Sequence, residues 1–159
     1  MLVVGAWAAA QASACAVKVK DDTVSGSIIR LPDIREIDHV AVFHIPDNVS
    51  TMTAVTPEEL QTNYFYEKLE FRVLLARAKL ARLRHALSLL KVDTRSSYCD
   101  ARWGILFYGK DKKVNFSLFT NQFGTLVTVN GENFETGKYQ NAGRSFIKWL
   151  KQNFSSFDL

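Results

Sequence analysis

The hydrophobic and polar positions of this chain follow two different periods, and the change between them separates a helical part from a strand part. Leucines between Leu74 and Val92 recur at spacings of three and four, which places them on one stripe of a helix. From Cys99 onward apolar and polar residues alternate, as they do in strands with one buried face. A second helical pattern, with an apolar and a basic side, closes the chain over about residues 140–153.

Local signals set several of the expected boundaries. Thr56 and Glu59 have the spacing of a capping box, and Pro57 between them suits the first position of a helix. The pair Asn130-Gly131 favours a tight hairpin, because both central residues of that turn need a positive φ. Further strand patterns lie over 39–45 and 67–73. Together these signals predict an α+β domain, with an antiparallel β-meander of about four to six strands packed against two or three helices on one face.

The first sixteen residues carry no charge and form an alanine-rich apolar run. This run ends in small residues before Cys15, which is the pattern that a signal peptidase accepts after Ala14. The first cation is Lys18, so the basic opening of a signal peptide is missing, and we consider a start upstream of Met1. The alternative is a buried N-terminal helix. We therefore expect a signal peptide over 1–14 and a folded protein outside the cytosol.

The remaining chain has the length of one domain, and its composition, 47% hydrophobic and 12% aromatic, is sufficient for a core. Residues 15–36 are mostly polar and are expected to form a flexible lead or tether. Residues 37–159 are expected to form the α+β domain.

The net charge of +4 is unevenly distributed. Six cations lie between Glu70 and Asp93 with no acid among them, so the rest of the chain carries −2. We expect a basic helix flank that recruits an acidic protein or an anionic envelope component, rather than nucleic acid. The alternative is a solvated helix surface without a partner. The binding residues expected on this flank are Arg77, Arg82, Arg84 and Lys91.

Four aromatic residues are candidates for a recognition surface, because tyrosine and tryptophan are favoured at interfaces. Core packing is the alternative for each of them. They are Tyr64, Tyr66, Trp103 and Tyr108.

The two cysteines, Cys15 and Cys99, permit two modifications. In an oxidising compartment they can form one disulfide. Residues 12–15 also resemble a loose bacterial lipobox, in which case lipid on Cys15 would tether the protein to a membrane and leave Cys99 as a free thiol.

No motif for a cofactor or a metal ion stands out, and we expect neither. His39 and His44 are five residues apart, so in a strand they point to opposite faces and cannot share an ion. The sequence therefore predicts an exported binding module without catalytic activity, such as an inhibitor, an immunity protein or an assembly accessory. It would lie in the periplasm, on the outer side of the inner membrane or in the outer membrane, or be secreted. The alternatives are an envelope hydrolase that uses Cys99 as its nucleophile and a lipid-anchored structural protein.

Overall fold

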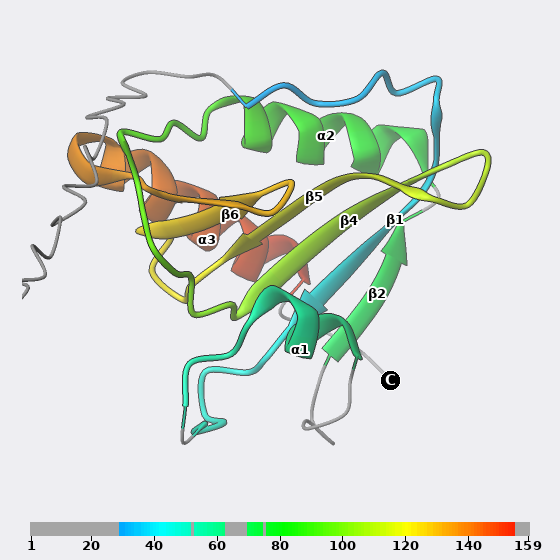
Figure 1. Cartoon of the computed structure of the whole chain (residues 1–159). Helices are drawn as coiled ribbons and strands as arrows, with labels where there is room; N and C mark the ends of the chain where they lie inside the picture. Colours follow the sequence, from blue (N-terminus) through cyan, green and yellow to red (C-terminus); the bar gives the residue numbers. More distant parts are fainter. Residues whose placement is uncertain (1–28, 52, 63–69, 75, 155–159) are drawn as a thin grey trace, which may run out of the picture.

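The structure is a computed structural model, and it describes residues 29–51, 53–62, 70–74 and 76–154. Its centre is one twisted antiparallel sheet with helices on both faces (Figure 1). The strands are β1 (Ile37–His44), β2 (Glu70–Leu74), β3 (Thr94–Arg95), β4 (Trp103–Gly109), β5 (Val114–Thr120), β6 (Leu126–Val129) and β7 (Glu132–Glu135). The helices are α1 (Pro57–Thr62), α2 (Arg77–Ser88), the 3-10 turn η1 (Gly137–Tyr139) and α3 (Gln140–Phe154). The predicted α+β class is confirmed.

The strand order is β2-β1-β4-β5-β6-β7-β3. The predicted meander is present as the run from β4 to β7, in which each strand pairs with the next. The sheet has seven strands rather than about four to six, because β1 and β2 extend it at one edge and the two-residue β3 adds to the other. The Asn130-Gly131 turn has φ values of 49° and 86°, as its hairpin requires.

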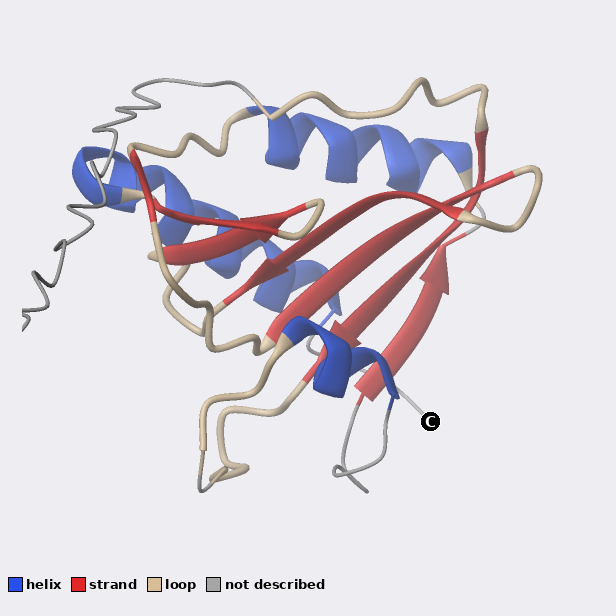
Figure 2. Cartoon of the chain, viewed as in Figure 1, coloured by secondary structure: helices blue, strands red, loops and turns tan. Residues whose placement is uncertain are grey.

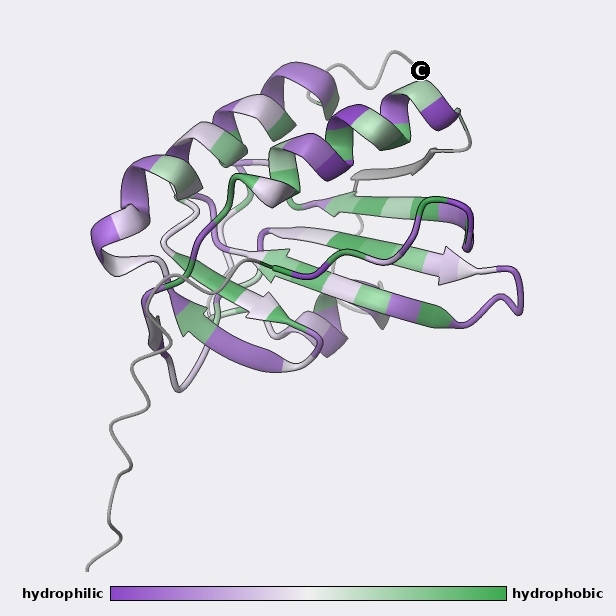
Figure 3. Ribbon diagram, turned by 90° about the horizontal axis from the view of Figure 1, so that it is seen from above, coloured by the Kyte–Doolittle hydropathy of each residue, from purple (hydrophilic) through white to green (hydrophobic). Residues whose placement is uncertain are grey.

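Two helices share one face of the sheet, as expected, but a third helix covers the other face. Helices α2 and α3 lie on one face and α1 lies on the other (Figure 2). Seen from above, α2 and α3 run side by side across their face (Figure 3). Helix α1 begins with the predicted capping box: the Thr56 amide donates to Glu59 Oε2 at 2.8 Å, and the Glu59 amide donates to Thr56 Oγ1 at 3.2 Å.

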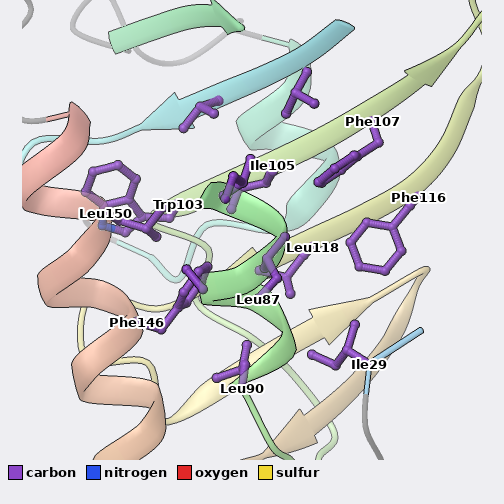
Figure 4. Packing of buried hydrophobic residues seen from close by; sticks show 14 of the residues in the cluster. Ile29, Leu87, Leu90, Trp103, Ile105, Phe107, Phe116, Leu118, Phe146 and Leu150 are labelled. Carbon is purple, nitrogen blue, oxygen red and sulfur yellow. The ribbon is translucent and has the colours of Figure 1, made fainter. Parts of the chain in front are cut away.

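The main core fills the space between the sheet and helices α2 and α3 (Figure 4). Alternate residues of the central strands point into it, including Trp103, Ile105 and Phe107 of β4, and they meet Leu87 of α2 and Leu150 of α3. The other residues of β1, β4 and β5 face α1 and form a second, smaller cluster with Leu60. This division follows from the period of two in strands.

The segment before β1 packs onto the main core. Ile29 is buried in it, and Leu31 and Ile34 pack against it. Our division of the chain assigned residues 29–36 to a flexible lead, yet in the structure these residues lie along α2. The segment docks because these three large apolar side chains lose contact with water when they pack on the core.

Candidate functional site

A groove runs between α2 and α3 on the outer side of the helix layer. Its volume is about 330 Å³. The lining residues are His85, Ala86, Leu89, Ala142, Ser145, Phe146 and Trp149. The surface is therefore mainly apolar, and it includes two large aromatic rings from α3, those of Phe146 and Trp149. A concave apolar surface of this size is typical of binding sites.

The local sequence explains why this groove is open. Leu80, Leu83 and Leu87 of α2 point toward the sheet, as do Phe146 and Leu150 of α3. The flanks that face each other carry small side chains instead, namely Ala86 on α2 and Ala142 and Ser145 on α3. Small residues on both flanks leave space between the helices.

Leu89 is the most distinctive residue of the groove. It follows the last residue of α2 and is 58% exposed, whereas Leu87 and Leu90 beside it are fully buried. Trp149 lies across the groove, is half-buried and packs against the main core. These two residues present apolar area that the fold leaves in contact with solvent.

The helices around the groove are basic and contain no acid. Helix α2 carries four cations and α3 carries three, and neither sequence has an aspartate or glutamate. Arg82 lies one turn before His85 and Ala86, and Lys148 lies one turn after Ser145, so both are placed near the groove. Both side chains are exposed, and no ion pair among the described residues includes either of them.

The four basic residues predicted as one flank do not form one surface, because two of them already have partners within the fold. Arg84 is half-buried and its guanidinium donates to the carbonyl oxygen of Pro32. The ammonium of Lys91 lies 5.6 Å from the ring centroid of Tyr139. Arg77 is exposed on the flank of α2 that carries Arg84, and only Arg82 borders the groove.

The charge of Arg84 also acts on the segment that it holds. The pKa of Asp33 is lowered to about 2, chiefly by a hydrogen bond from the Arg35 side chain and further by the charges of Arg35 and Arg84. Asp33 therefore stays ionised over the physiological range and keeps this end of the segment polar.

The aromatic candidates are separated as well. Trp103 is fully buried and stacks on His44 with ring centroids 3.7 Å apart, so its predicted place on a recognition surface is wrong. Tyr108 is half-buried on the opposite face of β4 and stacks on His39 at 4.4 Å. Tyr64 and Tyr66 lie outside the described residues.

Cys99 is a free, buried thiol, and Cys15 lies outside the described residues. Burial raises the pKa of Cys99 to about 11, although a hydrogen bond with Thr128 opposes the shift. The thiolate is the nucleophilic form, so this environment suppresses the reactivity of Cys99 at neutral pH. The described residues of the pocket beside Cys99 include no histidine that would act as its base.

The described residues offer neither a metal-binding cluster nor a membrane-spanning helix. They contain no group of three or more histidine, cysteine, aspartate or glutamate residues that could hold a metal ion. None of the helices in these ranges has the length and apolar character needed to cross a bilayer.

Sequence reasoning found the charge of this site but missed its apolar residues, Leu89, Phe146 and Trp149. Leu89 departs from the leucine stripe of α2, and that departure was the available signal. A comparison of the chain with protein-family models, curated proteins and solved structures found no match.

Proposed function

We propose that this protein is a non-catalytic binding module that holds an acidic, amphipathic protein segment in the groove between α2 and α3. The observation that carries this proposal is an apolar groove of about 330 Å³ set between two helices that contain cations and no acids. The roles that fit such a module are an inhibitor, an immunity protein or an assembly accessory.

The shape of the groove favours a helical segment as its occupant. An amphipathic helix places its apolar residues at spacings of three and four into a groove of this kind. Leu89 and Trp149 would contact that stripe from the two sides, and tryptophan is among the residues that contribute most to interface energies.

The charge of the rim favours acidic flanks on the same segment. Arg82 and Lys148 have no described ion-pair partner, so a carboxylate that approaches them replaces water and not an internal contact. Such rim charges speed association and select the partner by sign, and they weaken as salt rises.

The proposed compartment is outside the cytosol, and its support is the uncharged run before Cys15. Mass spectrometry of the mature N-terminus tests it independently of the groove. A chain that begins at Cys15, with or without lipid, agrees with export, and a native chain that keeps Met1 contradicts it.

A peptide titration tests the binding function. The probe is a synthetic helical peptide with a leucine stripe flanked by glutamates, and its control carries lysine at each glutamate position. We expect the acidic peptide to shift the indole NMR signal of Trp149 and to bind at least about tenfold more tightly than the basic one.

Matched variants locate the contact. Leu89→Ser and Arg82→Glu should each lower the affinity for the acidic peptide by about tenfold. Arg77→Glu, on the other flank of α2, should change this affinity by less than about twofold. Vesicles rich in phosphatidylglycerol form a further arm. The proposal fails if the acidic and basic peptides bind with equal affinity while the protein binds these vesicles equally well with and without the Leu89→Ser change.

A further inference from the structure

A second pocket lies on the opposite face of the sheet, under α1. Its volume is about 310 Å³. Helix α1 forms one side, the loop before β4 forms another, and strands β5 to β7 form the floor. Figure 2 shows α1 on the face that α2 and α3 leave uncovered, so this pocket is separate from the groove.

The position of α1 is fixed by contacts that leave the pocket open. Leu60 is fully buried against the sheet, and the absence of a side chain at Gly104 permits this approach: a Cβ there would lie 3.1 Å from Leu60 Cδ2. The capping box at Thr56 holds the first turn. Ser117 and Thr128, both small, lie on the floor and do not fill the space.

Part of the floor of the pocket has its hydrogen bonds satisfied internally. Thr128 Oγ1 donates to Asn133 Oδ1 at 2.7 Å, and Asn133 Nδ2 donates to the Ser97 carbonyl oxygen at 3.5 Å. These groups form a fixed surface with little remaining capacity for a ligand.

The rest of the lining is rich in acceptors. Glu58 is an exposed carboxylate with no ion pair among the described residues. Gln61 Nε2 donates to the Pro57 carbonyl oxygen at 3.1 Å, which leaves Oε1 as an acceptor. The hydroxyl groups of Ser97 and Ser117 add two more acceptors, and the described lining contains no lysine or arginine.

We propose that this pocket binds a small organic cation that has a primary ammonium group and an apolar body. The ammonium has three donors and no acceptor, which suits Glu58 and Gln61 Oε1. Hydrogen bonds between charged groups are the stronger class. The apolar body would lie against Phe119 on the floor and Tyr98 at the rim. Glu58 and Glu59 also offset the partial positive charge of the first turn of α1.

A series of three probes with one ring and different charges tests this proposal: phenethylamine, 2-phenylethanol and phenylacetate. The readout is the backbone NMR spectrum, in which Cys99 and Gly131 report on the pocket. We expect phenethylamine to shift these signals and to bind at least about tenfold more tightly than the alcohol or the acid.

The matched variants are Glu58→Gln, which removes the charge beside the pocket, and Glu36→Gln, which removes an exposed charge far from it. Glu58→Gln should lower the affinity for phenethylamine by about tenfold, and Glu36→Gln should leave this affinity unchanged. The proposal fails if the three probes bind alike, if none shifts these signals, or if both variants have the same effect. Because the groove residues are on the other face, either site can fail without the other.

Discussion

The guanidinium of Arg84 on α2 donates a hydrogen bond to the carbonyl oxygen of Pro32, and this contact joins the segment before β1 to the helix layer. Ile29, at the start of the same segment, is buried in the main core. Arg84, one of the four cations predicted to bind an external partner, therefore stabilises the fold instead. Among the predicted cations, Arg82 is the one that borders the groove.

Arg84 and Arg82 should therefore separate stability from binding. Arg84→Ala removes the hydrogen bond to Pro32 and should lower the free energy of unfolding by about 1–3 kcal/mol. It should also speed tryptic cleavage after Arg30 and Arg35, whose segment loses its hold on α2. Arg82→Ala should change stability by less than about 0.5 kcal/mol, because its side chain is exposed. Chemical denaturation of the two variants measures their free energies of unfolding. Equal losses of stability would contradict a structural role for Arg84 that Arg82 lacks.

Gly143 on α3 should be intolerant of any side chain. A Cβ at Gly143 would collide with the carbonyl oxygen of Gly124, in the turn between β5 and β6. A glycine-to-alanine change inside a helix normally stabilises it by up to about 1 kcal/mol. Here we expect Gly143→Ala to lower stability by about 2 kcal/mol, because backbone on both sides must move. Asn141→Ala, at an exposed position of the same helix, is the control and should be neutral or slightly stabilising. A stabilising effect of Gly143→Ala would show that α3 does not approach this turn so closely.

The buried thiol of Cys99 should make stability depend on alkaline pH. Its pKa is about 11 in the folded protein and 9.0 for an unperturbed thiol, so the unfolded chain loses this proton first as the pH rises. The protonated thiol contributes about 2–3 kcal/mol to the free energy of unfolding. This contribution is complete below pH 9 and is lost as the pH approaches about 11.

A matched pair of chains isolates that contribution. Both carry Cys15→Ser, and one also carries Cys99→Ala, which does not titrate. Between pH 9 and 11 the free energy of unfolding should fall more steeply in the chain that retains Cys99. Parallel pH profiles, or rapid labelling of native Cys99 by a thiol reagent at pH 8, would contradict the burial of this residue.

The parts of the fold that depend on neighbouring residues were predictable. The capping box of Thr56 and Glu59 and the hairpin at Asn130-Gly131 are both present, because each is set by a few adjacent residues. The alternation in β4 and β5 is also present, although both faces are largely buried: Ile105, Phe107 and Leu118 are in the main core, whereas Leu106 and Phe119 are in the smaller cluster.

Features that depend on distant pairing were not predictable. Nothing local indicates that β1 pairs with β4, that α1 lies on the opposite face from α2, or that Arg84 meets Pro32. The same limit applies to the site. The cations of α2 are visible in the sequence, whereas the groove exists only once α2 and α3 are placed side by side.

Site-specific photo-crosslinking in the native cell tests the central claim most directly. A photo-reactive phenylalanine analogue replaces Leu89 in the groove, and a control chain carries it in place of Val114, which is 44% exposed on β5. We predict a discrete adduct from position 89, whose partner contributes an acidic amphipathic segment, and no such adduct from position 114. Absence of an adduct at position 89, or the same adducts from both positions, would contradict a binding role for the groove.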